Sequence, residues 1–115
     1  MSDCIFCRIA SGEIPATIVA RTPEAVAFRD LNPQAPTHVL VIPVKHFAGL
    51  EDMAGAEGAR HLAAVTALAV QVAKQEGLSD DGYRVVFNSG ANGGQSVYHL
   101  HAHVLGGRKM SWPPG

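Results

Sequence analysis

Long apolar runs and clustered basic side chains, which mark membrane and nucleic-acid-binding proteins, are both missing from this sequence. No apolar run approaches the ~20 residues that span a bilayer, so we expect no membrane segment. Lysine and arginine number 9 against 10 acidic residues, and Arg108-Lys109 is the only adjacent basic pair. Because clustered positive side chains bind nucleic-acid backbones, this charge balance argues against a nucleic-acid partner.

Cysteine is also scarce, with two residues, and the chain does not start with a basic segment followed by an apolar one. We therefore expect no signal peptide. Few cysteines without an export signal are typical of a reducing compartment, which predicts a cytoplasmic protein. The 115 residues contain no internal repeat or low-complexity segment, and they predict one domain over residues 1–115 with a C-terminal tail at 108–115.

The most unusual segment, residues 99–105, alternates histidines with apolar residues. Successive side chains on a β-strand point to opposite faces. The pattern therefore predicts a strand with His99, His101 and His103 on one face, ~6.5 Å apart, and the apolar residues packed on the other. Imidazoles in such a row can bind a metal or act in nucleophilic catalysis, and the pattern alone leaves both hypotheses open.

The rest of the pattern predicts an α+β fold. We expect a helical turn near residues 5–9, strands at 17–20, 25–29, 38–44 and 83–88, and a helix at 54–76. One face of that helix is apolar, and Gly77 suits the position that ends it. Because short connections join the strands at both ends of the chain, we predict a mainly antiparallel sheet of about five strands with one long helix on it.

Three further features carry expectations of their own. Three glycines within residues 89–96 leave the backbone able to turn tightly and to present N–H groups to an anion. His61, near the start of the long helix, is expected to face solvent. Trp112, followed by two prolines, is expected to dock on a surface rather than stay in water.

Cys4 and Cys7 form a Cys-x-x-Cys motif. A redox motif is one interpretation, although the strand expected before it is missing. A zinc half-site is the other, because structural zinc takes four nitrogen or sulfur ligands. His46 and His99 are the candidates that would complete it.

Residues 99–105 match the pattern His-φ-His-φ-His-φ-φ, where φ is apolar, and the chain resembles the histidine triad (HIT) family in its Hint branch. The resemblance runs from Cys4 to Gly115 and is strongest at residues 30–38, 94–99 and 112–115. It implies a hydrolase or transferase that cleaves purine nucleoside 5′-phosphoramidates of the AMP type through a nucleotidyl-histidine intermediate. The alternatives are a dinucleoside polyphosphate hydrolase and a purine-nucleotide-binding interaction protein with incidental catalysis.

The resemblance also implies roles for individual residues around the phosphate. His101 matches the nucleophile of the family, and His103 and His38 lie around the scissile phosphate. Ser96 and the backbone near Gly94 are expected to contact the phosphate and the leaving group. No cofactor is required for this catalysis, because imidazolium, a hydroxyl and backbone dipoles can carry the developing charge.

The nucleotide itself is expected to contact a second set of residues. Asp30 matches a ribose-binding carboxylate and Asn88 a polar contact, although a turn residue and a strand-end hydrogen bond are the plain structural alternatives. The apolar slot for the base is matched by Ile5, Phe6, Ile9, Phe28 and Leu31. For the two phenylalanines, ordinary core packing is the rival interpretation.

Zinc and a second subunit complete what the resemblance implies. Some relatives with paired N-terminal cysteines hold a structural zinc through the first triad histidine, so Cys4, Cys7, His46 and His99 form the expected ligand set. A homodimer is expected, with the sheet extended across the two subunits. Trp112 would then lie near the leaving-group pocket of the opposite subunit, with Ser111 where relatives can carry histidine.

Overall fold

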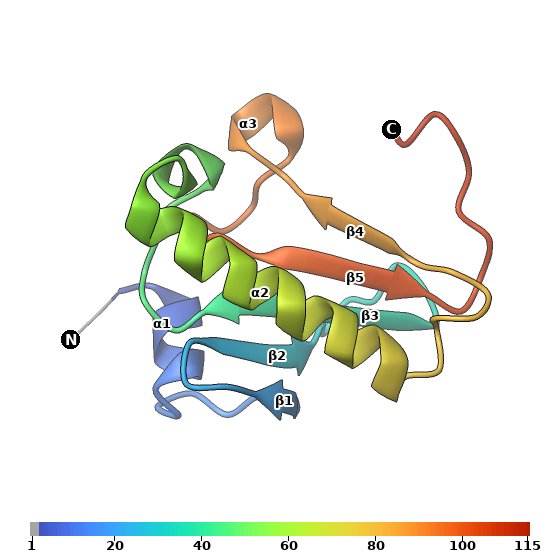
Figure 1. Cartoon of the computed structure of the whole chain (residues 1–115), viewed down its shortest axis with the longest axis horizontal. Helices are drawn as coiled ribbons and strands as arrows, with labels where there is room; N and C mark the ends of the chain where they lie inside the picture. Colours follow the sequence, from blue (N-terminus) through green and yellow to red (C-terminus); the bar gives the residue numbers. More distant parts are fainter. Residues whose placement is uncertain (1–2) are drawn as a thin grey trace.

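The structure, a computed structural model, describes residues 3–115 and has one open sheet crossed by one long helix (Figure 1). The strand order is β1-β2-β3-β5-β4, and every neighbouring pair is antiparallel. This architecture confirms the predicted α+β fold of five strands and one long helix. No helix within residues 3–115 is long and apolar enough to cross a membrane.

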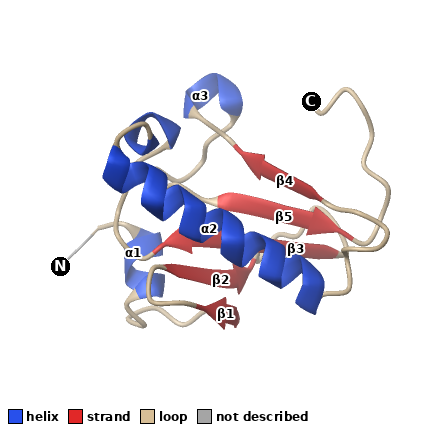
Figure 2. Cartoon of the chain, viewed as in Figure 1, coloured by secondary structure: helices blue, strands red, loops and turns tan. Residues whose placement is uncertain are grey.

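Figure 2 distinguishes the strands from the helices and from the irregular C-terminal tail. The strands are β1 (Ile18–Arg21), β2 (Ala25–Arg29), β3 (Thr37–Pro43), β4 (Arg84–Phe87) and β5 (Ala102–Gly106). The α-helices are α1 (Ile5–Ala10), α2 (Ala56–Gln75) and the single turn α3 (Gly90–Gly93), and a 3-10 helix, η1 (Leu50–Met53), precedes α2.

Helix α2 covers one face of the sheet and α1 packs on the other. On β2, alternation sends Ala25 and Ala27 into the cluster under α2, and Val26 and Phe28 into the cluster with α1. Strand β3 is buried on both faces, as its continuous apolar run predicted. The sheet therefore has a structural face under α2 and a second face on which α1 can help to form a site.

Helix α2 begins two residues later and ends one residue earlier than the predicted range 54–76. Gly77 follows it with φ +73°, a left-handed conformation that glycine adopts without strain. The residues before Ala56 form η1 instead of the first helical turn. The expected solvent exposure of His61 is wrong, because the loop before η1 lays the Phe47 ring on this imidazole at 5.1 Å and leaves it 7% exposed.

The C-terminal tail lies away from the body of the chain (Figure 2). Trp112 is 81% exposed, so the expected docking of this side chain does not occur on its own subunit. The tail contacts the sheet through Arg84, whose guanidinium donates to the Ser111 carbonyl at 2.8 Å. An exposed tryptophan is unusual in a folded chain, and this one remains available to a second surface.

Candidate active site and metal cluster

The histidine segment enters the sheet later than its alternation predicted. Strand β5 begins at Ala102, so His103 lies on the strand while His99 and His101 precede it. The predicted strand over residues 99–105 is therefore too long at its start, although His101 and His103 lie side by side with their ring centroids 4.9 Å apart. The reason is tertiary, because the Leu100 N–H donates to the Phe47 carbonyl at 2.7 Å, in a loop that belongs to no strand. His99 belongs to the cluster with the two cysteines, while His101 and His103 line a cavity.

His101 is a buried imidazole with one nitrogen already committed. Its Nδ1–H donates to the His99 carbonyl at 2.9 Å, which leaves Nε2 as the unprotonated nitrogen. The ring is 5% exposed, and the Phe6 ring meets it edge-on at 5.1 Å. His101 lines a cavity of about 260 Å³ on the α1 face of the sheet. An unprotonated nitrogen in a cavity wall is the arrangement that a nucleophile requires.

A chain of hydrogen bonds fixes the protons of the neighbouring histidines. His38 Nδ1 accepts from the Gln34 N–H at 3.0 Å, so His38 Nε2 carries the proton and donates to His103 Nδ1 at 2.9 Å. The His103 proton must therefore sit on Nε2, which is buried without a hydrogen-bond partner among residues 3–115. An orphaned buried donor in a cavity wall is suited to an oxygen or nitrogen atom of a ligand.

The electrostatics keep this pair of histidines neutral. Burial lowers the pKa of His103 to about 4, and the nearby His101 and His38 lower it further. Burial also lowers the pKa of His38, against an opposing effect of Asp30, whose Oδ2 lies 3.5 Å from His38 Nε2. At pH 7 both His38 and His103 are therefore neutral.

The cavity brings together most of the predicted site residues. Its lining includes the predicted Ile5, Phe6, Ile9, Phe28, Asp30, Leu31, Ser96, His101 and His103. Leu31 is 98% exposed and stands at the rim. His38 does not line the cavity but supports His103 from behind. We call Ile5, Phe6, Ile9 and Phe28 the apolar part of this lining, and Asp30, Ser96, His101 and His103 its polar part.

Besides His38, three predicted residues lie outside this lining. Asn88 is half-buried after β4, and Gly94, with φ +82°, closes the turn α3. Trp112 lies on the exposed tail. The sequence analysis in turn missed Leu40 and the segment 15–17, which also line the cavity. Leu40 could have been found, because it lies two residues after His38 on the same face of β3.

The predicted metal ligands form a separate cluster on the other side of His101. The ligand atoms of Cys4, Cys7, His46 and His99 all lie within 4.8 Å of one another. His99 Nδ1 lies 3.3 Å from Cys4 Sγ, 3.5 Å from Cys7 Sγ and 3.2 Å from His46 Nδ1. Tetrahedral zinc with ordinary bond lengths separates its sulfur and nitrogen ligands by ~3.6 Å and two nitrogens by ~3.3 Å. The four residues therefore fit zinc.

The surroundings of His99 support the same conclusion. This side chain is fully buried, and its Nε2–H donates to the Pro43 carbonyl at 2.8 Å. That bond leaves Nδ1 unprotonated and directed at the cysteines, which is how a second-shell carbonyl orients a ligating histidine. Burial lowers the pKa of His99 to about 4, so the imidazole is neutral, as a metal ligand must be.

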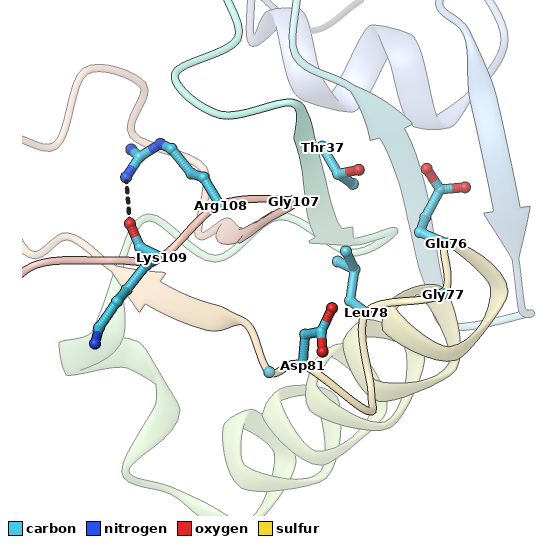
Figure 3. A pocket seen from close by; sticks show the side chains of 9 residues that line it. Thr37, Glu76, Gly77, Leu78, Asp81, Gly107, Arg108 and Lys109 are labelled. Carbon is cyan, nitrogen blue, oxygen red and sulfur yellow. Dashed lines mark hydrogen bonds between the residues drawn. The ribbon is translucent and has the colours of Figure 1, made fainter.

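A larger hollow than the cavity at His101 lies elsewhere and lacks these features. It measures about 670 Å³ and is lined by residues after α2 and after β5, among them Glu76, Asp81 and Lys109 (Figure 3). The Glu76 carboxylate is engaged by Arg29 at 2.7 and 3.0 Å. This hollow contains no histidine, cysteine or serine that could act as a nucleophile, so the smaller cavity at His101 is the candidate active site.

Comparison with known proteins identifies the class to which this fold and site belong. The family model of the HIT domain matches residues 11–110. The chain therefore belongs to the HIT family. A HIT family hydrolase from Legionella pneumophila is 53% identical and superimposes with a TM-score of 0.94, covering 98% of this chain and 100% of that one. A histidine triad protein from Clostridium difficile is 43% identical, with a TM-score of 0.91 and 96% of both chains covered.

Two plant proteins are among the more similar relatives in sequence. The 14 kDa zinc-binding protein of Zea mays is 56% identical over 117 residues, with 99% of this chain and 89% of that protein covered. The adenylylsulfatase HINT1 of Arabidopsis thaliana is 50% identical over 117 residues, covering 99% and 78% of the two chains. These relatives support a hydrolase activity for the chain, and the zinc-binding name agrees with the geometry of the cysteine cluster.

Proposed function

We propose that this protein hydrolyses purine nucleoside 5′-phosphoramidates of the AMP type through a nucleotidyl-histidine intermediate on His101. The observation that carries the proposal is the bond from His101 Nδ1–H to the His99 carbonyl, which leaves Nε2 unprotonated in the cavity wall. The nitrogen attacks the α-phosphorus, the bond from phosphorus to the leaving amine breaks, and water then releases the nucleotide and regenerates His101.

The polar part of the cavity supplies donors for this displacement. The Nε2–H of His103 is held toward a ligand by the bond from His38, and it can donate to a phosphate oxygen or to the leaving nitrogen. The Ser96 hydroxyl lies in the same lining. Donors that are fixed before the reaction stabilise charge without reorganisation. Catalysis needs no metal or organic cofactor in this proposal.

The apolar part of the cavity suits a purine base. Phe6 and Phe28 meet edge-on at 5.4 Å and form a wall with Ile9. Asp30 lines the same cavity, and its Oδ2 lies 3.5 Å from His38 Nε2, so this carboxylate is a candidate partner of the ribose hydroxyls. Its Oδ1 accepts from the Asn32 N–H at 2.8 Å, so the turn role and the ribose role are compatible in one carboxylate.

The charges of the site favour a single phosphate over a polyphosphate. Arg29 is the only lysine or arginine in the cavity lining, and its guanidinium is held by the Glu76 carboxylate. A polyphosphate chain would therefore meet no lysine or arginine of the lining that is not already paired with a carboxylate. A dinucleoside polyphosphate is therefore the poorer substrate in this proposal.

A comparison of substrates tests the proposed function. We expect AMP to be released from adenosine 5′-phosphoramidate at least ~100-fold more efficiently, in kcat/KM, than from diadenosine polyphosphates, a difference of about 2.7 kcal/mol in transition-state stabilisation. Chromatographic detection of AMP measures both reactions. Preference for the polyphosphate would favour the alternative hydrolase. Binding of AMP without cleavage of either compound would favour a nucleotide-binding interaction protein.

We also propose a homodimer, formed through the edge strand β4 and the outer face of α2. Strand β4 ends the sheet, and its Val85 is 39% exposed. An open strand edge with exposed apolar side chains is a template for pairing with a second copy. In such an assembly Trp112 would reach the polar part of the partner's cavity.

Deletion of residues 111–115 tests the role of the tail. The tail is exposed and contributes no core, so we expect the melting temperature to change by less than ~3 °C. The ratio of kcat/KM values for a small and a bulky amine leaving group should change by ~10-fold. Light scattering that finds a monomer at micromolar concentration would contradict the dimer, and an unchanged ratio would contradict the role of the tail.

A further inference from the structure

Gln95 has a buried side chain whose polar atoms are all engaged with the backbone. Its Oε1 accepts from the Gly90 N–H at 3.0 Å, and its Nε2 donates to the carbonyls of Ala48 at 2.7 Å and Val97 at 3.1 Å. The residue is 8% exposed. Two carbonyls and one N–H determine the orientation of the amide, and only glutamine or asparagine chemistry can satisfy all three.

These three bonds join three segments of the chain, one of which lines the cavity. Gly90 begins α3, Ala48 follows the loop that carries His46, and Val97 lines the cavity. The Gln95 N–H also donates to the Gly90 carbonyl at 3.0 Å, so this residue closes the glycine-rich turn at two points. Glycine-rich turns have little conformational preference of their own, which makes such a clamp effective.

Ser96 lies in the sequence between Gln95 and Val97, which are joined by the hydrogen bond from Gln95 Nε2 to the Val97 carbonyl. Its hydroxyl has no hydrogen-bond partner within residues 3–115, and it lines the cavity. Nothing in that part of the chain directs the hydroxyl except the backbone on either side. That backbone is held by the bonds of Gln95 to Gly90 and Val97.

We propose that Gln95 is a positioning residue for the reaction, which holds the Ser96 hydroxyl and the turn before it against the reacting phosphate. Gln95 does not line the cavity, so it acts through its neighbours and not by touching the substrate. The inference rests on the proposed function at His101. It differs from that function because it concerns how one donor of the site is held, and not which residue attacks.

The close approach of Gly49 offers a second way to disturb the same amide. A Cβ atom at this position would lie 3.3 Å from Gln95 Oε1 and 3.6 Å from Nε2. The Gly49 backbone is extended, so alanine is acceptable there in conformation and would press only on the amide. Gly49→Ala therefore displaces the Gln95 amide without removing the oxygen and nitrogen atoms that form its hydrogen bonds.

The first test is Gln95→Met, which keeps the length of the side chain and removes its three hydrogen bonds. We expect kcat for adenosine 5′-phosphoramidate to fall about 10- to 100-fold, because small displacements of a catalytic group carry such costs. KM should change less than ~3-fold, because Gln95 itself does not line the cavity. Gln71→Met, at an exposed glutamine of α2 that pairs with Gln75 at 3.1 Å, is the matched control and should be unchanged.

A double-mutant cycle with Ser96→Ala shows whether Gln95 acts through Ser96. In the Ser96→Ala background, Gln95→Met should lower kcat by less than ~2-fold further, because the group it positions is already missing. Independent, multiplying losses would overturn the proposal, and so would a raised KM with unchanged kcat. Gly49→Ala should lower kcat ~3- to 10-fold, and it supplies the test if Gln95→Met does not fold. An unchanged kcat in Gly49→Ala would then overturn the proposal.

Failure of the proposed function gives a different result. The wild-type protein would then release no AMP, and the positioning role would fall together with it. If the wild-type protein releases AMP and Ser96→Ala releases it at the same rate, the positioning role alone is wrong and the proposed function of His101 stands.

Discussion

Replacement of His101 by glycine is expected to lower turnover of adenosine 5′-phosphoramidate on the order of 10⁴-fold or more. The imidazole would supply the attacking nitrogen, because the unprotonated Nδ1 of His103, the other histidine of the cavity lining, already accepts a hydrogen bond from His38. His38→Asn and His103→Asn should cost less, because those residues orient and donate without attacking. AMP release under single-turnover conditions measures all three effects.

Two observations keep this prediction specific. His61→Asn is the matched control, because His61 is also a buried histidine but packs on Phe47 outside the cavity. Its kcat should be unchanged, whatever happens to its melting temperature. Rapid quenching with labelled substrate should place the label on His101. Label on His103 or Ser96 would contradict the assignment of the nucleophile.

Removal of zinc is the second change from which we expect a large effect. The purified protein should contain about one zinc per chain, and a strong chelator should lower its melting temperature by about 10 °C or more. A metal that binds the folded chain alone adds several kcal/mol to its stability, and each kcal/mol shifts the midpoint of a small domain by ~4–8 °C. Atomic absorption and circular dichroism measure the two quantities.

The site of the metal is tested by removing its ligands. In Cys4→Ser/Cys7→Ser, the zinc content should fall below ~0.1 per chain and the chelator should no longer change the melting temperature. Turnover should survive brief chelation, because the cluster includes the side chain of His99, whereas the proposed attacking nitrogen belongs to His101. A metal-free wild-type protein of full stability would contradict the site and leave the two cysteines as ordinary thiols.

The parts of the fold that the sequence predicted well are those in which local pattern and burial agree. The apolar run of β3 and the apolar stripe of α2 both report how many faces are buried, and both were placed correctly. Asp30 and Ser96 were assigned by their motifs, and the structure places them in one cavity. The predicted zinc ligands also meet in space, although their roles and those of the cavity residues stay predictions.

The errors arise where a distant segment decides the outcome. His99 was predicted to lie on a strand, but the Leu100 N–H donates to the Phe47 carbonyl of a loop and the strand begins only at Ala102. His61 appeared exposed because periodicity cannot show that a loop folds over the start of α2. The contribution of Gln95 was equally invisible, since its three partners come from segments up to 47 positions away in sequence. Only tertiary contacts contain this information.

One residue, His99, carries two tasks on different parts of its structure. Its side chain belongs to the cysteine cluster, while its main-chain oxygen accepts the hydrogen bond that His101 Nδ1–H donates. Every amino acid brings the same main-chain oxygen. A descendant of this gene could therefore exchange the side chain at position 99, lose its metal, and still keep the attacking imidazole in the correct tautomer. The metal cluster can therefore be lost in evolution while the hydrogen bond that orients His101 is kept.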